Sequence, residues 1–301
     1  MTGAGRFLSK ARQAELSLIA VTAVWGLTFS MVKESLETIP PFLFMSYRFI
    51  LAFLVLAVVC GRRMARIDRR TAAAGILLGI FLYAAYSFQT FGLEHTTAGN
   101  AGFITGLFVV FVPILSIFIL HKRPSNRAVF SVVLATIGLA LLSLQPGTGV
   151  NVGDVLVLAC AFMYSLHIIY MDRFVQLYDI LLLTLIQMGV VAVLQAGSAL
   201  IFEDFVLPSG GYVWLTIIVC GIFASALAFF VQAWAQRQIS PVRTSVVLIM
   251  EPVFSVVFGF FLLGETLRWR GWLGCGLMLA AMLITELKPE RKNRQANKPA
   301  E

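Results

Sequence analysis

The stretch VRTSVVLIMEPVFSVVFGFFLL, residues 242–263, is apolar almost throughout and long enough to cross a lipid bilayer as a helix. Near its middle stands Glu251, followed at once by Pro252. A carboxylate at the centre of a membrane helix costs about 2.5–3.5 kcal/mol on insertion scales, so such residues usually face a protein interior or a wet cavity. Two interpretations are open. Glu251 is either a functional carboxylate or a structural one, paired with a buried cation on a helix that Pro252 merely kinks.

The composition of the whole chain is that of a polytopic membrane protein. Of its 301 residues, 59% are apolar and 13% are charged, and the mean hydropathy is +0.89. Ordinary soluble domains carry about 25% charged residues. The net charge is +8, but the basic residues stand in short clusters without the interleaved aromatic residues that stack on bases. We therefore expect a lipid bilayer, and no nucleic acid, as the surroundings of this chain.

The cysteines suggest no metal or disulfide chemistry. They lie far apart inside apolar segments, with no CxxC or Cys/His spacing, at Cys60, Cys160, Cys220 and Cys275. The sequence holds no Walker A pattern, so ATP is not expected to act directly, and no cofactor is expected. The apolar run that follows Lys10 and Arg12 is too long for a signal peptide and reads as an uncleaved first helix.

Ten apolar segments of bilayer length follow one another along the chain. Turn residues or charges mark most boundaries between them, such as Pro40-Pro41 and Gln145-Pro146-Gly147. The expected spans are residues 14–33, 41–60, 72–93, 99–120, 127–144, 153–171, 179–202, 212–235, 242–263 and 270–286. The predicted fold class is therefore an all-α membrane protein with ten transmembrane helices.

The basic residues predict the orientation of these helices. All but four of the 23 lysines and arginines fall on segments that lie on the same side as the N-terminus. The exceptions are Lys33, Arg268 and Arg270 in the outer loops and Arg48 within the second span. We expect both termini to be cytoplasmic, the protein to lie in the inner cell membrane, and residues 287–301 to form a disordered basic tail.

An internal repeat divides the chain into a first unit, residues 14–144, and a second unit, residues 153–286. The residues matched at a shift of 139 positions are Trp25 with Tyr164, Arg48 with Gln187 and Pro113 with Pro252, and Gly79-Ile80-Phe81 matches Gly221-Ile222-Phe223 at a shift of 142. Each unit holds five spans, an odd number, so the second unit must enter the membrane from the opposite side. The prediction is two inverted five-helix repeats.

Inverted repeats are typical of secondary transporters, whose substrate site lies near the midplane between the repeats. Exchanging the conformations of two inverted halves converts an outward-open cavity into an inward-open one. Glu251 has no acidic counterpart in this repeat, because the matching position is Val112. The two repeats are therefore similar in fold but differ at this position, because only the second carries an ionisable side chain there.

Short motifs along the chain resemble the ten-helix drug/metabolite transporter superfamily, EamA type. They are Ala23-Val24-Trp25-Gly26-Leu27-Thr28-Phe29, Pro41 with Arg48, Asn100-Ala101-Gly102-Phe103-Ile104-Thr105-Gly106-Leu107 leading to Val112-Pro113, and Glu251-Pro252-Val253-Phe254 with Gly264-Glu265. The resemblance covers Glu15 to Thr285 and implies an inverted-repeat transporter, commonly an exporter of amino acids or other small metabolites. It carries over four candidate site residues by motif, namely Trp25, Arg48, Asn100 and Glu251.

Arg48 and Glu251 are expected at similar depths in the membrane. At 1.5 Å per residue, Arg48 lies ~10 Å from the outer end of its span and Glu251 ~14 Å from the inner end of its own. In a hydrocarbon core ~30 Å thick, their offset along the membrane normal is only several Å. They either form a buried ion pair or bind the substrate, and a zwitterion could compete for both partners of such a pair.

Aromatic and polar residues at helical spacing complete the candidate substrate site. Their stripes serve packing or binding, although hydroxyls and a histidine at membrane depth need partners in either case. The further candidates are Phe29 on the stripe of Trp25, Tyr83, Tyr86 and Thr90 in the third span, Tyr164 and His167 in the sixth, and Gln187 and Gln232 as amide donors. His167 is also a candidate proton relay.

The leading hypothesis is a secondary carrier that exports amino acids or related small metabolites by alternating access, with protons as a candidate coupling ion. A passive facilitator or channel and a flippase for lipid-linked substrates remain as alternatives. An intramembrane enzyme would need a paired acid, or a nucleophile with its base, at membrane depth. Glu15 and Asp154 lie at span ends and Glu251 stands alone, so no enzymatic activity is expected.

Overall fold

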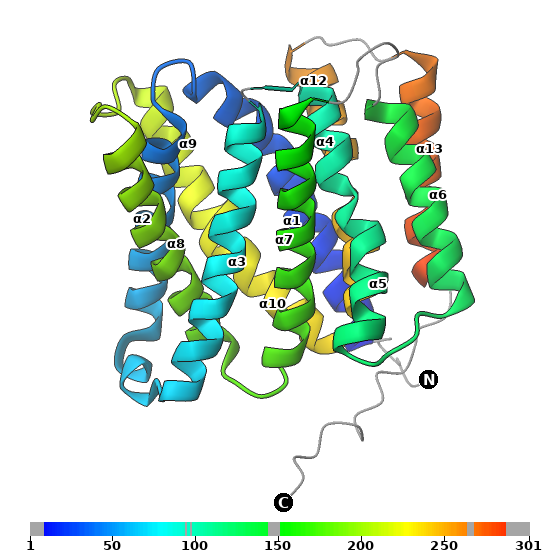
Figure 1. The fold of residues 1–301 in the computed structure, drawn as a ribbon, viewed down its shortest axis with the longest axis horizontal. Coiled ribbons are helices and arrows are strands. Elements are labelled where there is room, and N and C mark those ends of the chain that lie inside the picture. The colour runs from blue at the N-terminus through cyan, green and yellow to red at the C-terminus, as the bar shows by residue number, and fades with distance from the viewer. Residues whose placement is uncertain (1–8, 94, 97, 144–150, 264–267, 287–301) are drawn as a thin grey trace, which may run out of the picture.

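The structure is a computed structural model that describes residues 9–93, 95–96, 98–143, 151–263 and 268–286 (Figure 1). Every regular element in this part of the chain is helical. The predicted tail, residues 287–301, lies outside the described residues.

The first half of the chain runs from α1 to α6, and α4 and α5 together make one crossing. Its elements are α1 (Lys10–Ser35), α2 (Pro41–Cys60), the 3₁₀ turn η1 (Gly61–Arg66), α3 (Arg69–Leu93), α4 (Ala98–Gly106), α5 (Phe108–Ile119) and α6 (Asn126–Ser143).

The second half runs from α7 to α13. Here α9, η2 and α10 make one crossing, and α11 and α12 make another. Its elements are α7 (Val152–Phe174), α8 (Ile180–Phe202), α9 (Gly211–Gly221), the π-helix η2 (Ile222–Leu227), α10 (Ala228–Gln238), α11 (Pro241–Leu248), α12 (Glu251–Leu263) and α13 (Trp269–Glu286).

These crossings confirm the predicted all-α membrane fold. Within the described residues, seven helical segments are long and apolar enough to span a bilayer, and α6 and α13 contain shorter apolar helices. Together with α1 they give the ten expected crossings, and their ends lie within a few residues of the expected ones.

The helix ends follow from local capping chemistry. Asp179 caps the N-terminus of α8, because its side chain accepts hydrogen bonds from the amides of Leu181 and Leu182. α2 begins at a proline pair, and its next two amides donate to the carboxylate of Glu203 at the end of α8, both at 2.8 Å. At the start of α3, hydrogen bonds from the Thr71 side chain and amide lower the pKa of the Asp68 carboxyl below its usual value.

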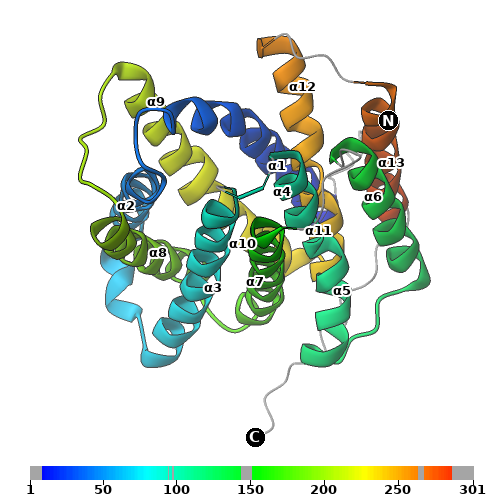
Figure 2. The same cartoon turned by 45° about the horizontal axis from the view of Figure 1, so that its top comes forward.

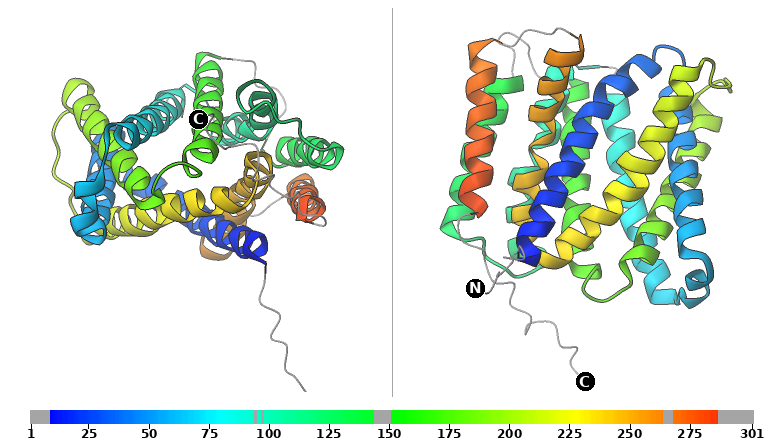
Figure 3. Two further views of the ribbon diagram at one scale, coloured as in Figure 1. Left: turned by 90° about the horizontal axis from the view of Figure 1, so that it is seen from below. Right: turned by 180° about the vertical axis from the view of Figure 1, so that it is seen from behind.

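Each helix contact described below has an equivalent in which every helix is replaced by its counterpart from the other half. α2 packs on its counterpart α8 at one end of the molecule, and α6 packs on its counterpart α13 at the other end (Figures 1 and 3). Between them α1 packs on α10 as α7 packs on α3, and α1 packs on α12 as α7 packs on α5 (Figure 2). The two halves are therefore related as an internal repeat.

The repeat is inverted, as the sequence predicted. In Figure 1, α1 rises from the lower edge of the molecule to the upper edge, whereas α7 descends from the upper edge. Five crossings, α1 included, precede α7, and an odd number reverses the direction of entry.

The glycines matched at a shift of 142 positions occupy equivalent helix contacts. A Cβ atom on Gly79 of α3 would lie 2.6 Å from the Cβ of Val190 on α8. A Cβ atom on Gly221 of α9 would lie 2.9 Å from Leu51 Cδ2 and 3.0 Å from the backbone oxygen of Arg48, both on α2. Since α2 and α8 are counterparts, both glycines permit the same close approach once in each half.

Candidate functional site

The π-helix η2 exposes a backbone acceptor inside the bundle. The N–H of Ala228 bonds to the carbonyls of Phe223 and Ser225 and bypasses that of Ala224, its partner in a regular α-helix. The Ala224 carbonyl is thereby released, although the residue is completely buried. Short π-helical insertions are often found at functional sites for this reason.

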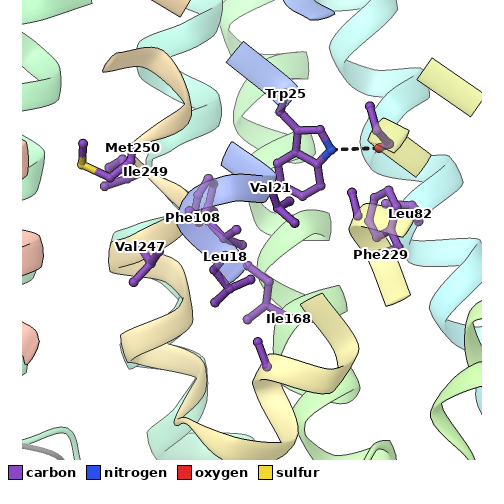
Figure 4. Close-up of a cluster of buried hydrophobic side chains, with 14 of the residues drawn as sticks. Leu18, Val21, Trp25, Leu82, Phe108, Ile168, Phe229, Val247, Ile249 and Met250 are labelled. Carbon is purple, nitrogen blue, oxygen red and sulfur yellow. Dashed lines mark hydrogen bonds between the residues drawn. The ribbon is translucent and has the colours of Figure 1, made fainter. Parts of the chain in front are cut away.

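Two candidate residues from the first half donate to this carbonyl. The indole Nε1 of Trp25 on α1 lies 2.8 Å from the Ala224 oxygen, the contact drawn as a dashed line in Figure 4. The Arg48 guanidinium on α2 donates through Nη2 to the same oxygen at 3.3 Å and through Nε to the Ser225 hydroxyl at 2.7 Å. Trp25 and Arg48 are both buried. Both therefore join the first half of the chain to the second.

Aromatic contacts continue from Trp25 around the interior of the bundle. Trp25 packs on Phe229 of α10 with ring centroids 5.6 Å apart, and Phe229 meets His167 of α7 edge-on at 5.9 Å. His167 neighbours Tyr164 at 6.2 Å, and Tyr164 meets Tyr86 of α3 at 6.4 Å. In Figure 4, Trp25 and Phe229 lie beside η2 within the buried apolar cluster.

Arg48 closes this series of contacts. Its guanidinium carbon lies 5.6 Å from the centroid of the Tyr86 ring and 5.3 Å from that of Phe49. A closed ring of side chains results, and we call it the interior ring. It consists of Trp25, Phe229, His167, Tyr164, Tyr86 and Arg48, joined at Ala224. The interior ring unites five of the residues predicted from the sequence, from four helices of the two halves.

Glu251 lies at an interruption of the ninth crossing. α11 ends at Leu248, a turn follows at Ile249 and Met250, and α12 begins at Glu251 itself. Pro252, which has no N–H to donate, then stands in the first turn, where this lack costs little. The regular helix is therefore interrupted one turn ahead of Pro252, which cannot donate to the Leu248 carbonyl. A carboxylate at the N-terminus of a half-helix is favoured by the helix dipole.

The counterpart crossing in the first half is interrupted as well. α4 ends at Gly106 and α5 begins at Phe108, upstream of Pro113. Pro113 and Pro252 are matched in the repeat, so each half carries a discontinuous helix ahead of its matched proline. Discontinuous helices at membrane depth are tolerated where they are buried in protein or line a wet cavity.

Arg48 and Glu251 do not form the direct ion pair that was one of the two open interpretations. No nitrogen of Arg48 lies within 4.0 Å of a Glu251 oxygen, because the guanidinium is turned toward Ser225 and Ala224. Glu251 begins α12, which packs on α1, the helix that carries Trp25. Glu251 is partly buried, and no described residue donates a hydrogen bond to its carboxylate.

The third-span stripe is divided between two environments. The Tyr83 hydroxyl lies 2.6 Å from Ser198 Oγ on α8, so it joins α3 to α8 rather than the interior ring. The Thr90 hydroxyl donates to the Tyr86 carbonyl one turn back at 2.8 Å. Of these three residues, only Tyr86 belongs to the interior ring. Contact of Tyr83 and Thr90 with a substrate stays a prediction.

The predicted glutamines are fully buried beside the interior ring. Gln187 on α8 holds His167, with its Oε1 2.9 Å from the imidazole Nε2. Gln232 on α10 donates to Gln236 at 3.2 Å, and Gln236 donates to the Ile168 carbonyl at 2.8 Å. Phe29 and Asn100 were also predicted, but their side chains lie outside the described residues, so their roles remain predictions.

Sequence reasoning missed several residues that the structure places at the site. Ala224 contributes only a backbone oxygen, and no side-chain pattern marks a released carbonyl. It also missed a buried ion pair between Glu15 on α1 and Arg243 on α11. A signal for this pair was present, since opposite charges stand at the inner ends of the first and ninth spans.

Comparison with known proteins agrees with this geometry. The model of the EamA-like transporter family matches the chain twice, over residues 12–144 and residues 151–287. The chain belongs to the EamA-like transporter family. It is accordingly a multi-pass membrane transporter, which implies a small-molecule substrate.

Relatives of this transporter cover nearly its whole length. An uncharacterized transporter of Archaeoglobus fulgidus is 32% identical over 275 residues, which cover 91% of this chain and 86% of the relative. The uncharacterized inner membrane transporter YedA of Escherichia coli (strain K12) is 25% identical over 284 residues and 90% of each chain. A crystal structure with 20% identity covers 91% of this transporter and 98% of its own chain with a TM-score of 0.80, which supports the fold.

Proposed function

We propose that this transporter is a secondary carrier that exports amino acids or similar small metabolites by alternating access between its inverted repeats. The observation that carries the proposal is the Glu251 carboxylate, which stands at a helix interruption within the membrane span, without a hydrogen-bond donor among the described residues. A carboxylate at this depth is costly unless it is used, and binding of a polar substrate group is such a use.

The discontinuous crossings provide the moving parts of the proposed mechanism. Each half carries one, and the half-helices α5 and α11 pack on each other across the repeat boundary. A helix bends most easily where its regular hydrogen-bond pattern is interrupted, so each of these crossings can bend at its interruption. Exchange of the two bends would close the site on one side of the membrane and open it on the other.

The chemistry around Glu251 suits an amphipathic substrate. Tyr86 and Tyr164 are partly buried and offer aromatic faces, while Trp25 and Phe229 are buried. Arg48 and Glu251 supply opposite charges. An amino acid combines an apolar side chain with two charged ends, and so matches both kinds of surface.

Orientation and coupling complete the proposal. The distribution of basic residues supports cytoplasmic termini and an inner-membrane location, with repeats at residues 14–144 and 153–286 and a cytoplasmic tail at residues 287–301. Protons are the proposed coupling ion, and His167, held by Gln187 within the interior ring, is a candidate relay. The proposed role is transport without catalysis.

Counterflow in proteoliposomes tests the carrier proposal. Vesicles that contain the purified protein are preloaded with each unlabelled amino acid in turn, and uptake of the labelled form is followed. A carrier gives saturable, transient accumulation for at least one amino acid. Currents far above carrier turnover would instead favour a channel. Scrambling of labelled lipid without amino-acid counterflow would favour a flippase.

A charge-neutral variant tests the role of Glu251 in that assay. Glu251→Gln should abolish or strongly impair counterflow while leaving membrane insertion intact. The matched control is Glu203→Gln, the same change at a carboxylate that only caps α2. Full activity of Glu251→Gln would reduce Glu251 to a scaffolding role.

A further inference from the structure

The two opposite charges at the proposed site differ in their availability to a ligand. Arg48 is only 6% exposed, and its guanidinium donates to Ser225 and Ala224. The same guanidinium also lies over the rings of Phe49 and Tyr86. Its Nε–H and one Nη2–H, two of its five donors, are therefore engaged within the protein.

Glu251 differs from Arg48 in its contacts. Its carboxylate is partly buried, takes part in no ion pair with the described part of the chain and receives no hydrogen bond from it. Within the described residues, Glu251 is therefore a charge at a helix interruption that no hydrogen-bond donor satisfies.

We infer that this transporter recognises its substrate through an ammonium group that binds Glu251, and that a carboxylate without an ammonium is not recognised. An ammonium donates charge-assisted hydrogen bonds to a carboxylate, and Glu251 offers both of its oxygens. This inference rests on the proposed function and sharpens its substrate class. The substrate feature that this recognition requires is a primary amine attached to an apolar group.

The alternative is a bidentate bond between Arg48 and the substrate carboxylate. Through its Nε and Nη2 edge, Arg48 could make this bond only by giving up its bonds to Ser225 and Ala224. Through its Nη1 and Nη2 edge it would keep the Ser225 bond, and acids without an amine would then bind. If Glu251 recognises the ammonium, zwitterions and amines bind, while acids without an amine do not, because two carboxylates repel each other.

Ligand pairs that differ only in the end group test this inference. The probes are phenethylamine against 3-phenylpropionate and isopentylamine against 4-methylpentanoate, each titrated calorimetrically into the purified protein in detergent. Both amines should bind saturably and neither acid should bind. Binding of the acids alone, of amines and acids equally, or of neither class would overturn the inference.

A variant links the binding to the carboxylate. Glu251→Gln should weaken amine binding by about tenfold or more, the loss expected for one charge-assisted hydrogen bond. Glu203→Gln should leave amine binding unchanged. The comparison of amines with acids uses the unmodified protein, so it decides the question even if Glu251→Gln fails to fold.

The binding and counterflow experiments separate the two proposals. If amines bind but no amino acid shows counterflow, the carrier proposal fails and ammonium recognition stands. If amino acids show counterflow but amines do not bind, ammonium recognition fails and the carrier proposal stands.

Discussion

Trp25 and Arg48, on adjacent crossings of the first half, donate hydrogen bonds to the same carbonyl oxygen, that of Ala224 in the second half. The carbonyl can accept both because the π-helix withholds its usual N–H partner. One backbone atom therefore ties α1 and α2 to the eighth crossing. Any motion of the halves against each other must either carry these three elements together or break this joint.

The indole hydrogen bond should contribute measurably to stability. Trp25→Phe keeps an aromatic ring beside Phe229 but removes the donor, and should lower the free energy of unfolding by about 1 kcal/mol. Reversible unfolding of the purified protein in mixed micelles measures this change. The control is Trp214→Phe, because Trp214 is 43% exposed and packs only edge-on against Tyr47. Equal losses in both variants would contradict a special role for the Ala224 contact.

The bond between Arg48 and Ser225 should appear as a coupling energy. Arg48→Lys keeps the charge but loses the planar fork, and Ser225→Ala removes the acceptor. A double-mutant cycle on unfolding free energies should give a coupling of about 1–2 kcal/mol. In the control cycle, Ser198→Ala removes a hydroxyl that bonds Tyr83 instead. Its effect should add to that of Arg48→Lys within about 0.5 kcal/mol. Additivity in both cycles would show that the Ser225 contact carries no energy of its own.

Residue spacing predicted the frame of this molecule better than its site. Apolar length located ten crossings to within a few residues, because each must span the same bilayer thickness. The spacing of Tyr83 and Tyr86 did not determine their partners, because residues three apart differ by about 60° around a helix and can face different neighbours. Tyr83 accordingly meets Ser198, while Tyr86 meets Tyr164 and Arg48.

The remaining details of the site depend on backbone geometry, which residue patterns do not encode. No residue in η2 marks a π-helix, so the acceptor that engages Trp25 and Arg48 was not predictable from the sequence. The repeat alignment paired Arg48 with Gln187, but the two side chains have different partners. Arg48 donates a hydrogen bond to Ser225 in the other half, whereas Gln187 is hydrogen-bonded to His167 within its own half.

The buried ion pair between Glu15 and Arg243 should be costly to break from one side only. Glu15→Gln or Arg243→Gln alone should lower the unfolding free energy by about 3–5 kcal/mol, because each removes one member of a buried ion pair. The double variant should cost clearly less than the sum of the two. Unfolding of all three proteins in mixed micelles tests this, with the exposed Arg62→Gln as a control expected within about 0.5 kcal/mol of the parent. Simple additivity would mean that the two charges do not stabilise each other.

The equivalent glycines of the two halves should respond alike to added volume. Gly79→Ala places a methyl group against Val190, and Gly221→Ala places one against Leu51 and the Arg48 backbone. Each should destabilise the protein by about 1–3 kcal/mol, the usual cost of overpacking. Gly197→Ala in α8 is the matched control, because nothing lies within 4 Å of its added Cβ.

The control glycine should shift stability in the opposite direction. Alanine is favoured over glycine in a helix interior by about 0.5–1 kcal/mol, so Gly197→Ala should be neutral or stabilising. Thermal unfolding of the three variants side by side measures both signs. If Gly79→Ala and Gly221→Ala matched Gly197→Ala, the close approaches of α3 to α8 and of α9 to α2 would not be needed for the fold. If only one of the two destabilised, the equivalence of these contacts in the two halves would fail.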